Sequence, residues 1–299
     1  MSKPRISIIT PTFNRADFLR IAIDSVLAQS FGDFEHIIVD DGSTDQTPQF
    51  VEHYLTDPRI RYFRQENQGP SVARNVGIER SRGEFICFLD SDNFWAPLKL
   101  DQQLRLFTAY PDSGVIYGDV VTVDASGGEL HRRNMMRHSG AITRMLLVDN
   151  FISMNTTMAR ASLIREAGGF RQSDGLAEDY GLWLRMALLA KFRYASEFWA
   201  YYRIMPGRLS DRSLERVRDN ERLIRDFLQR RPSTFVVHRE TTDALNAFYC
   251  RKARIEALHA ETVAAWRSLG KAFSIAPLSS RVYRTGLRVL LDEFKRRAK

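Results

Sequence analysis

Short apolar runs alternate with helical patterns through the first 95 residues. Four runs rich in β-branched and aromatic residues predict strands, namely residues 6–10, 34–39, 60–63 and 85–89. We expect the first of these strands to end at Pro11. Between the runs, apolar residues recur every three or four positions and predict helices. This alternation is typical of βαβ units and of a mostly parallel sheet.

The next hundred residues continue the pattern less regularly. A helix is predicted over residues 97–110 and a strand over 114–124 that breaks at Gly118. Residues 131–138 form a basic, turn-like stretch, and residues 152–159 suit a strand or a loop.

From Asp211 the pattern is helical almost to the end, with breaks at Pro232 and Pro277. We therefore predict an α/β domain over residues 1–205 and a helical C-terminal region over residues 206–299.

Acidic residues follow two of the predicted strands. Asp40 and Asp41 come after one strand, and Asp90 and Asp92 come after another. Right-handed crossovers place the ends of parallel strands on one edge, where ligands bind. We expect Asp41, Asp90 and Asp92 to converge there. Paired acids are costly unless a cation lies between them, which favours a divalent ion over a solvated turn.

Composition and charge narrow the class of protein. The 299 residues carry a net charge of +8, unevenly spread. Residues 1–120 hold 12 Lys and Arg against 17 Asp and Glu, and residues 121–299 hold 32 against 19. The excess suggests an anionic partner for the second half: nucleic acid, an anionic membrane or a polyphosphorylated substrate. No recognisable reading module supports nucleic acid.

Two cysteines, Cys87 and Cys250, give no disulfide framework or zinc site. Neither a signal peptide nor a run of about 20 apolar residues is present. We expect a cytoplasmic protein.

Five motifs together resemble family 2 glycosyltransferases of the GT-A fold. They occur in the family's order across residues 5–205: Thr10-Pro11-Thr12-Phe13-Asn14, Val39-Asp40-Asp41-Gly42-Ser43, Gly69 to Asn75, Leu89-Asp90-Ser91-Asp92 and Glu178-Asp179. The resemblance implies a Rossmann-like, mostly parallel mixed sheet flanked by helices. It also implies an inverting transferase that uses a nucleotide sugar with Mg²⁺ or Mn²⁺.

The resemblance suggests roles for single residues. Asp92 is the expected metal ligand of the Asp-x-Asp motif, although Asn93 stands where the family often has a further Asp. The residues expected to bind the donor nucleotide are Thr10, Pro11, Phe13, Asp41, Arg74, Asp90 and Ser91. Among them, Asp41 is expected to accept a hydrogen bond from the nucleobase. Arg74 either faces the diphosphate or lies on the surface, and Asp40 either binds the nucleotide or caps a helix.

Helical periodicity separates two adjacent acids. Asp179 is followed at +3, +4 and +7 by Leu182, Trp183 and Met186, so it lies on the apolar face, whereas the line of Glu178 is less apolar. We expect Asp179 to be the general base. We expect the Glu178 carboxylate either to be stabilised by the helix dipole or to assist at the site.

A further motif, after these five, also departs from the family pattern. Met205 stands where the family commonly has a His that helps to hold the metal or diphosphate. Arg203 or Arg208 is the candidate for the missing positive charge.

In the C-terminal region, arginines interleave with apolar residues over 281–297. The pattern suits a helix lying on an anionic membrane, such as the inner face of a bacterial membrane. It suits equally a helix packed on its own domain.

The leading hypothesis is a metal-dependent inverting transfer from a nucleotide sugar, with UDP as the expected carrier, to a saccharide or lipid-linked acceptor. Bacterial surface polysaccharide or glycolipid synthesis would provide such acceptors. The alternatives are a weakened nucleotide-sugar-binding adaptor of the same fold and a nucleotidyltransferase. A nucleotidyltransferase would need a Gly-rich, basic loop after the first strand to hold a triphosphate, and Thr10-Pro11-Thr12-Phe13 is not such a loop.

Overall fold

The computed structural model describes residues 3–135, 137–205, 212–231, 235 and 239–297. Contacts divide the chain into two compact units. The first comprises Met1–Ala141, Phe151–Asp174 and Glu178–Gly207. The second comprises Ile142–Asn150, Gly175–Ala177 and Arg208–Lys299.

Nine strands of the described residues form one mixed sheet in the first unit, in the order β3-β2-β1-β4-β8-β6-β9-β5, with β7 paired to β6. Their bounds are β1 Ile6–Thr12, β2 Phe34–Asp40, β3 Ile60–Arg64, β4 Phe85–Phe88, β5 Phe94–Trp95, β6 Ser113–Val123, β7 Glu129–Arg132, β8 Met158–Arg160 and β9 Lys191–Arg203. Strands β3, β2, β1 and β4 run parallel, as predicted. The antiparallel β8 makes the sheet mixed.

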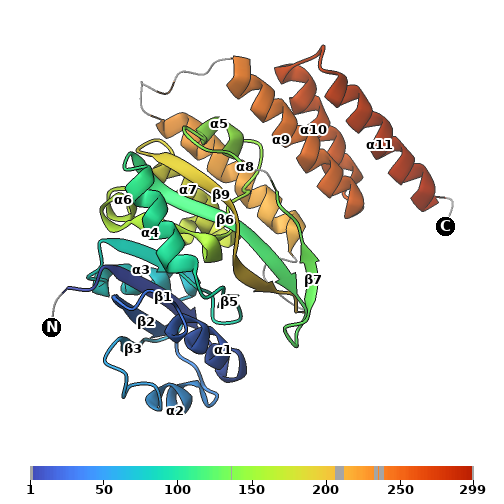
Figure 1. Cartoon of the computed structure of the whole chain (residues 1–299). Helices are drawn as coiled ribbons and strands as arrows, with labels where there is room; N and C mark the ends of the chain where they lie inside the picture. The colour runs from blue at the N-terminus through green and yellow to red at the C-terminus, as the bar shows by residue number, and fades with distance from the viewer. Residues whose placement is uncertain (1–2, 136, 206–211, 232–234, 236–238, 298–299) are drawn as a thin grey trace. The chain divides into compact units, whose positions relative to one another are not determined.

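Helices flank this sheet, as Figure 1 shows. Those of the first unit are α1 Ala16–Leu27, α2 Thr47–Glu52, α3 Pro70–Arg80, α4 Lys99–Ala109, α6 Ala161–Glu166 and α7 Glu178–Met186. Residues Ile6 and Ile8 of β1 pack with α1 and α4. Ile9 points to the other face, where a Cβ added at Gly77 of α3 would lie 2.4 Å from its side chain. Only glycine allows α3 to pack this close.

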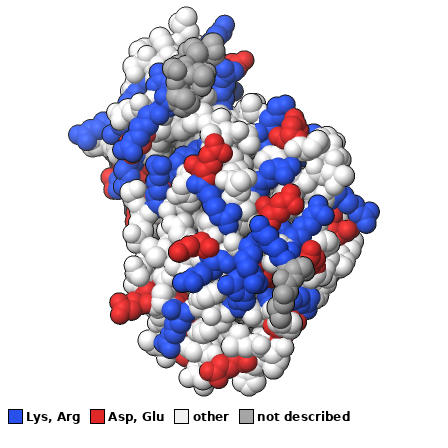
Figure 2. Space-filling view, turned by 90° about the vertical axis from the view of Figure 1, so that its left-hand side faces the viewer, with Lys and Arg blue, Asp and Glu red and all other residues white. Residues whose placement is uncertain are grey.

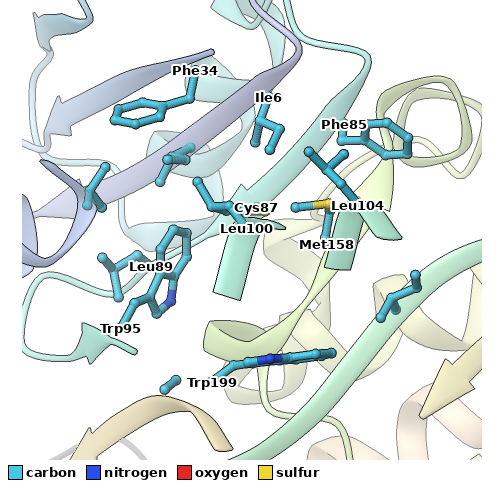
Figure 3. Packing of buried hydrophobic residues seen from close by; sticks show 14 of the residues in the cluster. Ile6, Phe34, Phe85, Cys87, Leu89, Trp95, Leu100, Leu104, Met158 and Trp199 are labelled. Carbon is cyan, nitrogen blue, oxygen red and sulfur yellow. The ribbon is translucent and has the colours of Figure 1, made fainter. Parts of the chain in front are cut away.

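The main core lies between the sheet and helices α1 and α4. Figure 3 shows Cys87 and Leu89 of the central β4 segment among Leu100, Trp95 and Met158. The rigid packing of this core fixes the position at which the chain leaves β4 and turns through Asp90 to Asn93.

Two sequence predictions were wrong in detail, and one strand was missed. Strand β1 continues through Pro11 to Thr12, because β4 has already ended on that side and the missing proline N–H removes no ladder bond. Gly118 does not break β6, since a change of register absorbs it. The sequence pattern also missed β9, which is stabilised by pairing with β6, far away in the chain.

The second unit is helical. It contains α5 Thr143–Leu146, α8 Ser213–Arg230, α9 Arg239–Leu258, α10 Thr262–Ile275 and α11 Ser280–Arg297. Helices α9 and α10 pack against each other as a helical hairpin, within the stretch that the sequence predicted to be helical. Cys250, Ala253, Leu269 and Val282 form part of its core.

Basic side chains are not evenly distributed over the surface. On the face drawn in Figure 2, Lys and Arg gather into a cluster, while Asp and Glu lie singly or in small groups.

Candidate active site

The acids predicted to converge lie at the carboxyl edge of the parallel strands. Asp41 follows β2 and Asp90 follows β4, and both strands pair with β1. Adjacent strands are about 4.8 Å apart, so these two strand ends lie roughly 10 Å from each other. This spacing suits an extended ligand across the end of β1.

Asp41 is buried and holds the loop that leads into α3. Its carboxylate accepts hydrogen bonds from Gln65 Nε2 at 2.7 Å and from the amides of Gln68 at 2.9 Å and Gly69 at 2.8 Å. Gly69 adopts a φ of +90°, which suits glycine. A carboxylate has about four acceptor positions, so one remains for a ligand donor.

Arg74 connects three elements. Its guanidinium donates to Glu178 Oε1 and to Asp90 Oδ1, each at 2.9 Å, and its side chain is only 7% exposed. Burial lowers the pKa of Arg74, but the two carboxylates outweigh it and raise the pKa overall. The two bonds link the first turn of α7 to the end of β4 through Arg74, which is 104 positions from Glu178 and 16 from Asp90. Arg74 is therefore neither on the surface nor unpaired.

Asp92 lies in a less favourable environment for its charge. Burial, and then the nearby Asp90 carboxylate, raise its pKa from 3.8 to about 6, against the opposing effect of Arg15 and Arg203. A carboxylate held in this way gains from a cationic ligand.

Arg203 supports the turn that carries Asp92. The buried guanidinium donates to the carbonyls of Asp92 at 3.0 Å and Ala125 at 2.6 Å. The backbone amide of Arg203 donates to Asn93 Oδ1 at 2.8 Å. These contacts show that Arg203 holds the Asp92–Asn93 turn from behind. They also show a structural role for Asn93. A contact between Arg203 and a diphosphate stays a prediction, and Arg208 lies outside the described residues.

The two adjacent acids of α7 have different surroundings. Glu178 pairs with Arg74, whereas Asp179 Oδ1 accepts from the amide of Tyr180 at 2.7 Å. Both side chains are partly exposed, and Leu182 and Trp183 below them are fully buried.

The remaining candidates near β1 and β2 vary in exposure. Thr10 is buried and shares a 2.9 Å hydrogen bond with His36 Nε2 inside the protein. Asp40 accepts from the amide of Ser43 at 2.8 Å and from the Tyr62 hydroxyl, so it stabilises the turn after β2. Pro11 and Ser91 are buried, and Phe13 is exposed.

Sequence reasoning missed Asn155. Its side chain forms a two-bond pair with Asp90, accepting from the Asp90 amide at 2.8 Å and donating to Asp90 Oδ2 at 2.9 Å. Each carboxylate oxygen of Asp90 thereby accepts one hydrogen bond, Oδ1 from Arg74 and Oδ2 from Asn155. The polar, β-branched run around Asn155 carried a weak signal, because its partner is 65 positions away.

The segment behind Asn155 is itself held by three side-chain donors from one stretch of chain, β5 to α4. Three successive carbonyls accept these bonds: Asn155 from Trp95 Nε1 at 2.7 Å, Thr156 from Gln103 Nε2 at 2.8 Å and Thr157 from Lys99 Nζ at 3.3 Å. We call this set the 155–157 clamp. It links the core to the position of Asp90.

The donor set at this edge fits a divalent ion only in part. No three His, Cys, Asp or Glu side chains of the described residues gather as an ion site. Asp90 already accepts from Arg74 and Asn155, so the Asp92 carboxylate, with its raised pKa, is the better placed of the two to bind an ion. Mg²⁺ often binds through one or two carboxylates together with substrate phosphates. The residues therefore fit an ion that arrives with a diphosphate.

The sequence profile described as "Glycosyl transferase family 2" matches residues 7–167, more than half of the chain. The chain belongs to glycosyl transferase family 2. This confirms the resemblance drawn from the motifs. Proteins with similar sequences include an uncharacterized glycosyltransferase of Rickettsia bellii, 32% identical over 185 residues. That match covers 61% of this chain and 26% of the relative.

A second relative is the putative teichuronic acid biosynthesis glycosyltransferase TuaG of Bacillus subtilis. It is 45% identical over 105 residues, which cover 34% of this chain and 42% of TuaG. The chain thus matches less than half the length of either relative.

Solved structures confirm the GT-A fold expected for family 2. The structure of S. aureus TarS 1–349 in complex with UDP-GlcNAc has a TM-score of 0.62 at 22% identity and covers 94% of this chain and 92% of that one. The mannosyltransferase PcManGT from Pyrobaculum calidifontis, in complex with GDP-Man and Mn²⁺, has a TM-score of 0.66 at 17% identity, covering 97% and 81%.

The helices of the described residues include none that is long and apolar enough to cross a bilayer.

Proposed function

We propose that this family 2 protein is an inverting glycosyltransferase that moves a sugar from a nucleoside-diphosphate carrier, UDP in the first instance, to an acceptor hydroxyl. The main support is the Arg74 bridge. It joins Asp90 of the Asp-x-Asp motif to Glu178 beside Asp179, so that the donor motif and the candidate base belong to one site.

The base in this proposal is Asp179. Arg74 pairs with the Glu178 carboxylate, so Glu178 is already engaged in an ion pair at 2.9 Å. Asp179 is the adjacent carboxylate on the same helical turn. It takes the proton of the acceptor hydroxyl as the oxygen attacks the anomeric carbon. One base and a direct displacement invert that carbon.

The leaving group in this proposal is a nucleoside diphosphate. Asp92 would hold Mg²⁺ or Mn²⁺ together with the diphosphate, and the ion would stabilise the negative charge that develops on departure. The raised pKa of Asp92 supports a cation at this position.

Recognition of the donor's nucleobase is assigned to Asp41. Its hydrogen bonds to Gln68 and Gly69 fix the carboxylate and leave about one acceptor position, enough for the N3–H of uracil. The UDP-GlcNAc complex of the TarS fragment is in keeping with a UDP-linked donor.

The acceptor class is proposed from the relatives. The name of TuaG refers to teichuronic acid biosynthesis, and a saccharide or lipid-linked acceptor of bacterial surface polysaccharide would suit the same chemistry.

The test compares two variants that differ by one position. Transfer or hydrolysis of a panel of UDP-sugars is measured with Mn²⁺, alongside UDP affinity by calorimetry. Asp179→Asn should lower kcat by about 10²–10⁴-fold with UDP affinity unchanged. Glu178→Gln should lower kcat less and weaken UDP binding, because Arg74 loses a partner. Equal activity of Asp179→Asn and the wild type would refute the assignment of the base.

A further inference from the structure

The outer face of α10 and α11 carries exposed apolar side chains. Eight of them are between 37% and 69% exposed: Val263, Trp266 and Phe273 of α10, and Tyr283, Leu287, Leu290, Leu291 and Phe294 of α11. We call these eight residues the outer apolar stripe. Scattered exposed apolar residues are normal, whereas a contiguous group marks a contact surface.

The stripe occupies one side of α11. Its members in α11 follow the spacing i, i+4, i+7, i+8 and i+11 from Tyr283, which is one helical face. Val282 and Val289, on the opposite face, are buried among residues of α9 and α10. The inward apolar face of α11 is therefore already packed against α9 and α10, and the stripe is a second apolar face, on the outside of the helix.

The register between the two helices makes the stripe continuous. The rings of Phe273 and Tyr283 are in contact, with centroids 6.5 Å apart. One and two turns away, Leu269 lies 3.2 Å from a Cβ added at Gly286, and Ala265 packs with Val289. Figure 1 shows the two helices side by side.

The same antiparallel register places Trp266 near the level of Leu290, and Val263 near that of Phe294. The exposed residues of α10 thus extend the face of α11 sideways.

Arginines border the stripe. On the helical wheel of α11, Arg284 and Arg288 follow Leu291 around the helix, and Arg267 lies beside Val263 on α10. All three are exposed. Arg284 donates to the carbonyl and hydroxyl of Ser280, groups that carry no formal charge, so its positive charge is not neutralised by these bonds.

We propose that the outer apolar stripe and its arginine border bind the surface of an anionic lipid bilayer. A helix with an apolar face and a basic flank lies in the interfacial plane, with its apolar side chains among the acyl chains and its guanidiniums at the phosphates. A second copy of the same face would bring like charges together, whereas an anionic bilayer supplies the opposite charge.

The proposal does not depend on the transfer reaction, although a lipid-linked acceptor would lie at such a surface. It is tested by co-sedimentation of the full chain with vesicles of phosphatidylglycerol and phosphatidylcholine, or of phosphatidylcholine alone. We expect binding to the anionic vesicles, a loss of binding as salt is raised, and little binding to the neutral ones.

Two variants separate the contributions. Arg284→Glu/Arg288→Glu should weaken binding to anionic vesicles by about tenfold or more. Leu287→Ser/Phe294→Ser should weaken it by at least about tenfold and leave the charge unchanged. The matched control is Arg254→Glu/Leu258→Ser, which changes exposed residues of α9 in the same unit and should bind as the wild type does.

Circular dichroism without lipid checks that each variant is folded. Sedimentation velocity without lipid measures self-association. Wild-type failure to bind anionic vesicles would overturn the proposal, and so would self-association through the stripe or equal loss of binding in the α9 control. UDP affinity, measured in the same samples, reports on the proposed function separately.

Discussion

At the scale of single residues, the acids of the site differ in what balances their charge. Asp90 is bonded to Arg74 and Asn155, and Asp41 is bonded to two backbone amides and a glutamine. Asp92 has a raised pKa instead. Residues at functional sites often retain such uncompensated charge, because a ligand supplies the compensation.

Removing the Asp92 charge should stabilise the protein at neutral pH. Its pKa is raised from 3.8 to about 6, so the native state holds more protons than the unfolded state between these values. Stability therefore falls as pH rises through that window, and the cost is complete above pH 6. Asp92→Asn should gain about 1 kcal/mol at pH 8, after allowance for partial exposure, and nothing at pH 4.

Urea unfolding of Asp92→Asn and the wild type at pH 4, 6 and 8 measures this difference. An equal gain at all three values would show that the charge of Asp92 is not its cause.

Arg74 should matter to stability as well as to the site. Arg74→Met leaves Asp90 and Glu178, with side chains 29% and 15% exposed, without their shared cation. We expect a loss of about 2 kcal/mol, less than for a fully buried pair because water reaches both carboxylates. Arg132→Met removes an exposed pair with Glu129 and should cost less than about 0.5 kcal/mol. Thermal unfolding of the two variants, with Glu178→Gln added to each, tests whether the effect belongs to the bridge.

At the scale of elements, the segment from β5 to α4 acts on the site through the 155–157 clamp. Lys99 is its charged member and is fully buried, with Nζ 2.7 Å from Gln103 Oε1 and 4.0 Å from the centre of the Trp95 ring. Burial lowers the pKa of Lys99 to about 8, while Cys87 opposes this shift. The clamp therefore contains a cation that is costly to bury.

Because of the buried Lys99 charge, the free energy of unfolding should depend on pH. Between pH 8 and 10.5 the native state holds fewer protons than the unfolded state, so Lys99 makes stability rise with pH through that window. The rise should be on the order of 2–3 kcal/mol and should be absent in Lys99→Met. Urea unfolding at pH 7.5, 9 and 10.5 follows it, with Lys191→Met, a change at an exposed lysine, as the control. Parallel curves for Lys99→Met and the wild type would contradict the expectation.

At the scale of the whole molecule, the second unit includes two short segments from within the first 205 residues. Residues of α5 and its neighbours pair with α9, through Arg144 with Glu240 and Asp149 with Arg251. The amide of Leu176 donates to Asp219 Oδ2 of α8 at 2.9 Å. The proposed boundary at residue 205 divides these contacts.

A chain that ends at Met205 should consequently be less stable than the full chain. It would lose the partners of Arg144, Asp149 and Leu176 and expose apolar residues of α5 to water. We expect a melting temperature lower by several degrees, or about 2 kcal/mol. Differential scanning calorimetry with and without UDP measures this change. An unchanged melting temperature would support residues 1–205 as an independent domain.

The predictions from sequence succeeded where the signal is local. The alternating strands and helices follow from backbone preference and from periodicity within a few residues, and the acids after two of the strands can be read directly from the sequence. They predicted an α/β domain with a mostly parallel sheet, whereas the GT-A fold and the family came from the resemblance of the five motifs to family 2 glycosyltransferases. Helical periodicity also placed Asp179 in line with Leu182 and Trp183, and both of these side chains are buried.

What only the tertiary structure decided is which distant groups meet. The sequence contains Arg74, Glu178 and Asn155, but their contacts with one another and with Asp90 join positions 16 to 104 apart. The pattern of α11 likewise contains two apolar faces, and the packing of α9 and α10 decides which one is buried. Such pairings depend on how the whole chain closes up, and no local preference determines them.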